Sequence, residues 1–122
     1  MGTYYTLANF TRRERIEFAG TSGMKAAEIV ANPQGAVIAA WYMLTHTDDD
    51  IAFVPDDRPF RGRPAYETDL SNFHDVTDEI VEQLIRNGDL TDHGTIQDGT
   101  DPVLKYRILR VRNRPPPPRD KL

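Results

Sequence analysis

The segment at residues 33–46 places the strongest constraint on how this chain can fold. It follows Asn32 and begins with Pro33, a pair typical of a helix start, because Asn can cap the first turn and Pro needs no N–H donor there. Residues 36–44 are all apolar, so the helix is apolar on nearly every side. We therefore expect other elements to enclose this helix as the centre of the core. The apolar run is also far shorter than the roughly 20 residues that a membrane span needs.

The other segments predict an α+β fold, in which a small, mostly antiparallel sheet has two or three helices packed on one face. In chain order we expect strands at 3–8 and 15–19, helices at 25–31 and 33–46, a strand at 50–54, a helix at 75–87 and a strand at 103–111. Residues 56–72 follow Pro55 and contain Pro59 and Pro64, and they are predicted to form a long surface loop, a length that is usually functional or mobile.

The helix predicted at 75–87 has the clearest pattern in the chain. Asp75 can cap its start, Gly88 is suited to end it, and its apolar residues form one stripe. The apolar residues of the strand predicted at 103–111 change from one face to the other, and this change indicates either a bulge or a strand that is covered on both faces at its end. We expect residues 1–112 to form a single globular domain, followed by a proline-rich basic tail at 113–122.

Charge is distributed very unevenly along the 122 residues. Residues 1–30 carry +1 (4 basic, 3 acidic), residues 31–102 carry −11 (4 basic, 15 acidic) and residues 103–122 carry +6 (7 basic, 1 acidic), which together give the net charge of −4. Such a pattern predicts association with charged partners, because the summed field steers encounters. We expect an acidic partner-binding face made by Asp48, Asp49, Asp56, Asp57, Asp75, Asp78, Glu79 and Glu82. We expect a basic arm made by Arg110, Arg112, Arg114, Arg119 and Lys121.

Motifs for catalysis or for cofactors are missing from the sequence. It contains no phosphate-binding glycine loop and no nucleophile elbow, so we expect no cofactor and no catalytic residues. The absence of cysteine excludes disulfides and thiolate metal sites and fits a reducing compartment. The chain also opens without a secretory signal pattern, and we therefore expect a cytoplasmic protein with no membrane association.

Histidine–aspartate pairs leave an enzyme open as an alternative. His46, His74 and His93 each lie within two residues of an aspartate, and such groups can form metal or acid–base sites, as in a metal-assisted hydrolase. Their spacing matches no metal-binding motif, which favours capping or solvated positions. Aspartates at 48–50 and 56–57 can likewise bind a hard cation, but their spacing matches no EF-hand loop and acidic runs are mostly exposed, which favours a solvated turn.

Nucleic-acid binding is a second alternative. A helix followed by a glycine-containing stretch and a tyrosine-containing strand is the order expected of a winged helix, and the basic tail and residues 12–15 can contact phosphates. The helix at 75–87 carries four acidic residues against one arginine. A recognition helix must approach phosphates, and this charge makes nucleic acid an unfavourable partner.

The first half of the chain resembles a scattered group of small bacterial and viral proteins. Those proteins open with MGxYYxxxNxTxxE, as residues 1–14 do here, and carry a GDRIxxVxD-like segment that reads DDIAFVPD at residues 49–56 of this chain. The likeness extends to residues 31–33. The resemblance implies a bacterial or phage origin and a cytoplasmic location, and it carries no catalytic residues.

Together these features predict a small non-enzymatic interaction module that acts by occupying the surface of a basic partner protein. Inhibitors, anti-defence proteins, immunity proteins and accessory subunits are of this type. The opposite charges of the helix at 75–87 and of the last strand, with Lys105 and Arg107, also predict a homodimer. The competing expectation is a monomer whose basic arm folds back onto its own acidic helix.

Overall fold

In the computed structural model of the protein, residues 2–64, 67–97 and 105–112 are described. The elements are β1 (Tyr5–Asn9), β2 (Glu14–Ile16), α1 (Ala26–Ala31), α2 (Pro33–Thr45), β3 (Ile51–Pro55), the 3-10 helix η1 (Leu70–Asn72), β4 (His74–Asp75), α3 (Thr77–Arg86), β5 (Leu90–Gln97) and β6 (Lys105–Val111). The predicted α+β class is confirmed. In the described part of the chain, the strands divide between a four-stranded sheet and a two-stranded hairpin.

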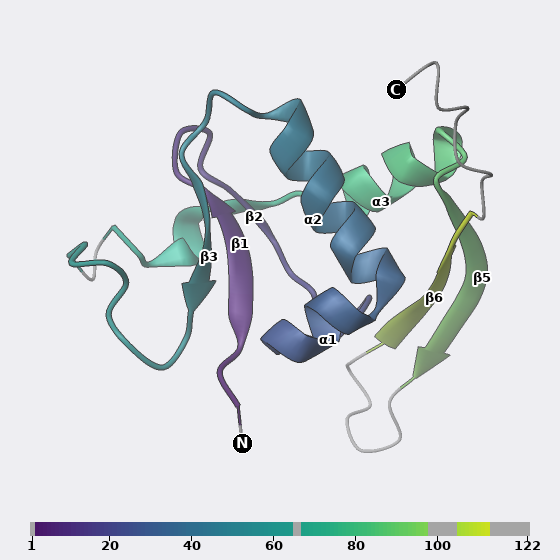
Figure 1. Cartoon of the computed structure of the whole chain (residues 1–122), viewed down its shortest axis with the longest axis horizontal. Helices are drawn as coiled ribbons and strands as arrows, with labels where there is room; N and C mark the ends of the chain where they lie inside the picture. The colour runs from purple at the N-terminus through teal and green to yellow at the C-terminus, as the bar shows by residue number, and fades with distance from the viewer. Residues whose placement is uncertain (1, 65–66, 98–104, 113–122) are drawn as a thin grey trace, which may run out of the picture.

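The four-stranded sheet has the order β3-β1-β2-β4 (Figure 1). Its two central strands form an antiparallel hairpin in which Leu7 pairs with Ile16. The strand β3 runs antiparallel to the other side of β1, although both helices α1 and α2 lie between these two strands in the sequence. At the opposite edge β4 pairs in parallel with β2 through Glu14 and Arg15. The sheet is therefore mostly antiparallel, as predicted.

Both faces of this sheet are covered. Neighbouring residues of β1 are buried on opposite faces, with Leu7 in the main core beneath the helices and Ala8 in a second cluster beneath the segment that joins β3 to β4. This segment contributes Phe60 and Phe73, which are 6% and 4% exposed. The prediction of a surface loop at 56–72 is therefore wrong for Phe60, because the ring covers apolar surface that the outer face of the sheet would otherwise leave in water.

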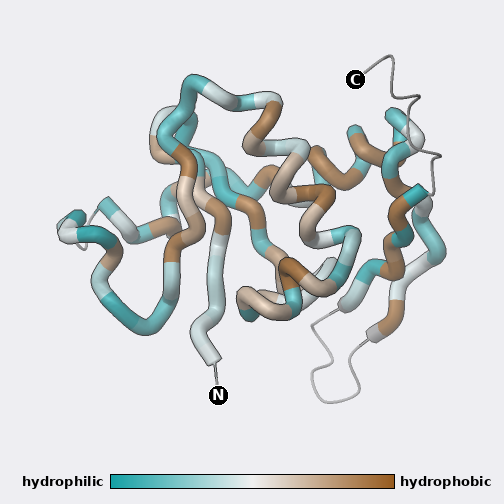
Figure 2. Tube along the Cα trace, in the orientation of Figure 1, coloured by the Kyte–Doolittle hydropathy of each residue, from teal (hydrophilic) through white to brown (hydrophobic). Residues whose placement is uncertain are grey.

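The helix α2 lies between the four-stranded sheet and the β5–β6 hairpin, as expected of the central helix (Figures 1 and 2). Ile38, Ala39 and Tyr42 are buried on its inner side. The expectation that α2 is enclosed on every side is wrong, because Leu44 is 74% exposed and Met43 is 42% exposed. The neighbouring elements pack against the inner side of the helix and leave an apolar strip of it uncovered.

The helix α3 confirms the predicted stripe and the predicted end at Gly88, but it begins at Thr77, and Val76 rather than the predicted Asp75 is its N-cap residue. Its buried residues include Ile80, Val81 and Leu84. The carboxylate of Asp75, one residue before the N-cap, accepts a hydrogen bond from the N–H of Thr77 at 3.0 Å and so satisfies the first N–H of the helix. Gly88 ends the helix with a φ of 81°, a left-handed conformation that favours glycine.

The strand β5 was not predicted, and it forms the hairpin with β6. The register shifts between Asp92 and Thr95, so the extra residue lies on β5, next to Gly94 with its φ of 101°. The predicted bulge in the last strand therefore belongs to its partner, where a glycine permits the backbone conformation. Leu90 and Leu109 attach the hairpin to the main core.

Candidate protein-binding surface

An open groove of about 700 Å³ runs along the uncovered strip of α2. Its walls come from α2, from α3, from Asp89 three residues after α3, and from the end of β6. The residues that line it are Val37, Ala40, Trp41, Leu44, Leu84, Asp89, Val111 and Arg112. We call this feature the α2 groove. It is predominantly apolar, with one acidic and one basic residue among those that line it.

The spacing of the α2 residues explains why they share one face. Positions 37, 40, 41 and 44 are three, four and seven residues apart, so they lie on the same side of a helix. The intervening Ile38, Ala39 and Tyr42 point into the core. An unbroken apolar run therefore supplies both faces. Packing buries one face fully, and on the other face Val37 and Trp41 are half-buried while Ala40 and Leu44 are exposed. Contiguous exposed apolar surface of this kind is typical of binding sites on soluble proteins.

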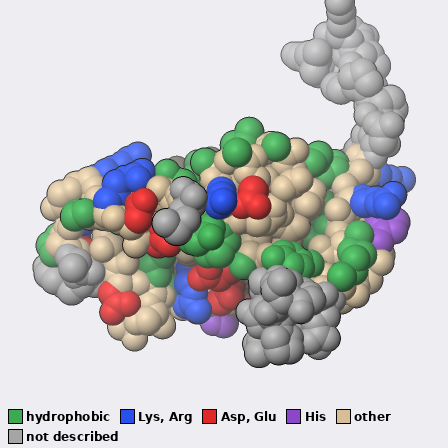
Figure 3. Space-filling model, turned by 90° about the horizontal axis from the view of Figure 1, so that it is seen from below, with side chains coloured by type: hydrophobic (Ala, Val, Ile, Leu, Met, Phe, Trp, Pro, Cys, Tyr) green, Lys and Arg blue, Asp and Glu red, His purple; other side chains and the backbone are tan. Residues whose placement is uncertain are grey.

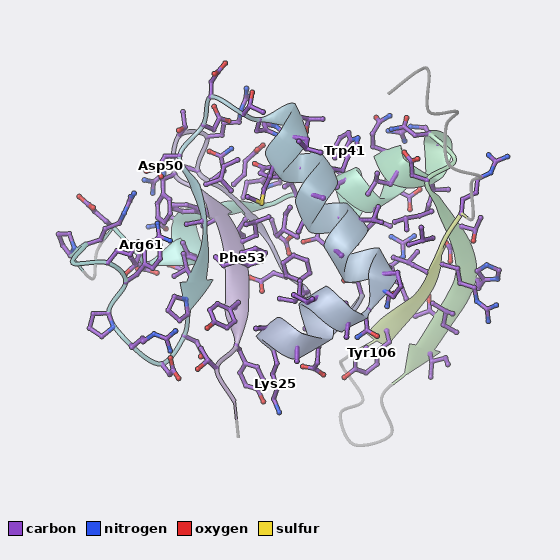
Figure 4. The ribbon with its side chains drawn as sticks, in the orientation of Figure 1. Lys25, Trp41, Asp50, Phe53, Arg61 and Tyr106 are labelled. Carbon is purple, nitrogen blue, oxygen red and sulfur yellow. The ribbon has the colours of Figure 1, made fainter. Side chains whose placement is uncertain are left out.

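Trp41 is the central residue of this surface and the only tryptophan of the chain. It projects from α2 toward α3 and is partly buried (Figure 4). On its other side lies a smaller hollow of about 220 Å³, which we call the acidic recess. Its lining comprises Glu14, Trp41, Tyr42, His46, Val76, Glu79, Ile80 and Gln83. An aromatic side chain thus separates an apolar groove from a recess that holds two carboxylates.

A buried hydrogen-bond network fixes the orientation of α2 at this position. The hydroxyl of Tyr42 donates to Oε1 of Glu14 at 2.7 Å, and Nδ2 of Asn9 donates to the same hydroxyl at 3.0 Å. Nδ2 of Asn9 also donates a hydrogen bond to Oδ2 of Asp49 at 2.8 Å. The same carboxylate oxygen accepts a hydrogen bond from Nε of Arg12 at 2.7 Å. Because Tyr42 is held inward by these bonds, its neighbour Trp41 is turned toward the groove.

Two pKa values reflect this network. Burial, together with the hydrogen bond to Glu14, raises the pKa of Tyr42 well above its usual range. The amide of Asn9 and the guanidinium of Arg12 hold the pKa of Asp49 below its usual range. Tyr42 therefore stays a neutral donor to Glu14, and Asp49 stays a charged acceptor.

The three histidines have partners other than the aspartates beside them in sequence. His46 stacks on the ring of Tyr42 at 4.2 Å, with its Nδ1 2.8 Å from the carbonyl oxygen of Tyr42. His74 lies 2.9 Å from Oε1 of Glu79, and His93 lies 2.9 Å from the hydroxyl of Thr91. Within residues 2–64, 67–97 and 105–112, no group of three or more His, Cys, Asp or Glu side chains is placed to hold a metal ion.

The structure separates the eight acidic residues of the predicted face into three places. Asp48 and Asp49 lie in the turn before β3, while Asp56 and Asp57 follow that strand. The other four belong to α3 and the strand that leads into it. Basic and acidic side chains lie next to one another on the face shown in Figure 3. Of the eight residues, only Glu79 lines the acidic recess.

Several of these acidic side chains bind cations of the same molecule. The guanidinium of Arg107 lies 2.9 Å from Glu82, 3.2 Å from Asp92 and 3.8 Å from Asp78. The predicted homodimer depended on attraction between the basic last strand, with Arg107, and the acidic helix α3. Arg107 instead pairs with Glu82 and Asp78 of α3 in its own chain. The homodimer stays a prediction, without support from this pair.

The basic arm is only partly described. Arg110 and Arg112 stand at the end of β6, and Arg112 lines the α2 groove. Arg114, Arg119 and Lys121 lie outside the described residues, as does the side chain of Lys105. Sequence reasoning missed the groove residues as functional candidates, because an apolar run in a helix is ordinarily a signal of the core.

No family model, curated protein or solved structure matches this chain. None of the helices in the described ranges is both long and apolar enough to cross a membrane.

Proposed function

We propose that this protein is a small interaction module that acts by binding the surface of another protein through the α2 groove. The observation that supports this function is the exposed apolar face of α2, on which Leu44 is 74% exposed and Trp41 stands at the centre. Tryptophan is among the residues that most often dominate the binding energy of protein interfaces. The proposal includes a bacterial or phage origin, a cytoplasmic location and a non-enzymatic role as an inhibitor or accessory subunit.

The chemistry of the groove and the recess supports a partner whose surface is apolar at its centre and basic beside it. A complementary surface has apolar side chains that fill the space beside Val37 and Leu44, and a cation that approaches Glu14 and Glu79 across Trp41. The acidic contribution thus comes from the recess beside α3, and the other predicted acidic residues act at longer range through the field of the molecule. A basic partner surface remains the expected one, with an apolar centre added to it.

Two single substitutions of matched exposure test this function. Leu44→Glu places a charge in the groove, whereas Val30→Glu places one on α1 at a residue that is 76% exposed and outside the groove. Proteins retained from a bacterial lysate by each variant are quantified by mass spectrometry, and the affinity for each retained protein is then measured by titration. We expect Leu44→Glu to weaken binding at least tenfold and Val30→Glu to change it less than twofold.

Equal retention by the two variants would contradict the proposal, because binding would then not depend on the groove. Loss of binding with Val30→Glu alone would move the interface to α1 and would contradict it as well. Circular dichroism and the melting temperature of each variant serve as controls for folding.

Nucleic-acid binding has one observation in its favour, since α3 is followed directly by the β5–β6 hairpin, the order of a recognition helix and a wing. Arg107 of this hairpin is engaged by Glu82 and Asp92, and the first turn of α3 holds Asp78 and Glu79. Protein binding is therefore the better-supported function. Strong, salt-sensitive retention on heparin that disappears when Arg114, Arg119 and Lys121 are replaced by Gln would favour nucleic acid instead.

A further inference from the structure

The end of the described chain lies at the α2 groove. Arg112, the last described residue, lines the groove together with Val111. The ten residues that follow, 113–122, contain four consecutive prolines at 115–118 and the cations Arg114, Arg119 and Lys121. The only proline run of the sequence thus begins three positions after Arg112, a residue that lines the α2 groove.

We propose that residues 113–122 bind in the α2 groove of their own molecule, with the prolines against Trp41 and the cations directed toward the acidic recess. The tail then competes with the partner protein for the same surface. This inference rests on the proposed function, because it assigns the groove a regulatory ligand within the chain.

The chemistry of the two parts is complementary. Proline runs favour an extended helix that exposes apolar rings, and grooves lined by aromatic residues bind this form because little conformational entropy is lost. Trp41 supplies the aromatic wall, and Val37 and Leu44 supply apolar surface on the same face. Glu14 and Glu79 provide negative charge beside Trp41, where the arginines that flank the prolines can approach.

The lengths also agree. Four prolines extend over about 12 Å at about 3.1 Å per residue, and the helix from Val37 to Leu44 is about 10 Å long at about 1.5 Å per residue. A ligand tethered by a short linker has an effective concentration of about 1 mM. An intrinsic Kd of about 0.1 mM for the tail would therefore keep most molecules closed and weaken partner binding about tenfold.

The full chain with Pro115–Pro118 all replaced by Ser tests this inference, and the full chain with Asn113→Ser is the matched control that keeps the prolines. Trp41 is the only tryptophan, so its fluorescence quenching by acrylamide and its indole N–H resonance report on the groove directly. We expect the proline variant to show at least twofold stronger quenching and a shifted indole resonance. We expect Asn113→Ser to behave like the unaltered protein.

A synthetic peptide of residues 113–122, added to the proline variant, should restore protection of Trp41. Unchanged quenching in the proline variant would overturn the inference. Protection that increases with protein concentration between 1 and 100 µM would also overturn it, because the tail would then bind a second copy.

These outcomes can be distinguished from failure of the proposed function. If the tail has no effect on Trp41 while Leu44→Glu still abolishes partner binding, the groove is a binding site without a regulatory tail. If the proline variant exposes Trp41 while Leu44→Glu and Val30→Glu retain partners equally, the tail binds the groove but the groove is not the partner site.

Discussion

Replacement of Asn9 by alanine should destabilise the protein more than any other single change at a polar residue of the network beneath α2. The side chain is fully buried at the end of β1, with an exposed fraction of 0%. Its Nδ2 donates to Tyr42 and Asp49 at 3.0 and 2.8 Å, and its Oδ1 accepts from the N–H groups of Thr11 and Arg12, both at 3.0 Å. All four hydrogen-bonding positions of the amide are therefore used.

The expected loss follows from these four bonds. Each hydrogen bond contributes about 0.5–1.5 kcal/mol net, and the exposed backbone of the 11–12 turn can bond to water after the change. Tyr42 also keeps its bond to Glu14. We therefore expect Asn9→Ala to lower the free energy of unfolding by about 2–4 kcal/mol, since the four contributions are only partly replaced.

Urea denaturation followed by circular dichroism measures this loss. Asn72→Ala, at an exposed position of η1, is the control and should change the free energy of unfolding by less than about 0.5 kcal/mol. A loss below about 1 kcal/mol for Asn9→Ala would refute the reasoning, because the four bonds would then contribute almost nothing net. A double-mutant cycle with Tyr42→Phe should show a coupling of about 1 kcal/mol between the two side chains.

Two further predictions concern acid sensitivity and the core. Hydrogen bonds from Asn9 and Arg12 lower the pKa of Asp49, and those from Gly94 and Arg107 lower the pKa of Asp92. Because both carboxyl groups then bind protons more tightly in the unfolded chain, their contribution to stability should be fully present above about pH 4 and be lost as the pH falls below it. The free energy of unfolding should fall less steeply with pH in Asn9→Ala than in the unaltered protein. Denaturant midpoints between pH 2 and 6 measure this, and equal slopes for the two proteins would contradict it. Phe18→Ala empties a fully buried site and should lower the free energy of unfolding by about 3–5 kcal/mol, as measured by urea denaturation. Phe10→Ala is the control, and because the ring of Phe10 is partly exposed, its removal should lower the free energy of unfolding by less.

Much of the fold could be predicted because its signals are local. Asp75 and Gly88 mark the ends of α3, and Pro33 marks the start of α2. The strand β5 escaped prediction because residues 91–96 are all exposed, so no face of the strand selects apolar side chains. Its two-residue alternation is therefore missing, and Gly94 further resembles a loop residue.

The candidate site could not be predicted, because it depends on which side of α2 the other elements leave uncovered. Val37 and Ile38 have equivalent chemistry in the sequence, but Ile38 is fully buried in the core, whereas Val37 packs at its edge and also lines the groove. Charge sums along the chain have the same limitation, since they cannot show that Arg107 forms ion pairs with Glu82 and Asp92 of the same molecule. The packing of segments that are distant in the sequence decides both which side of α2 is covered and which charges pair.

The strand order of the large sheet has a consequence for folding kinetics. The β1–β2 hairpin joins neighbouring segments and can form early, but β3 reaches β1 only after the chain has passed through both helices. Closure of so long a loop carries an entropic cost before any contact compensates it, which makes this pairing a slow step. Asp49, which accepts a hydrogen bond from the same Asn9 side chain that binds Tyr42 of α2, lies just before β3. The α2 groove should therefore mature late in folding, and if it binds a partner as proposed, gain of partner affinity during refolding should follow the slowest phase.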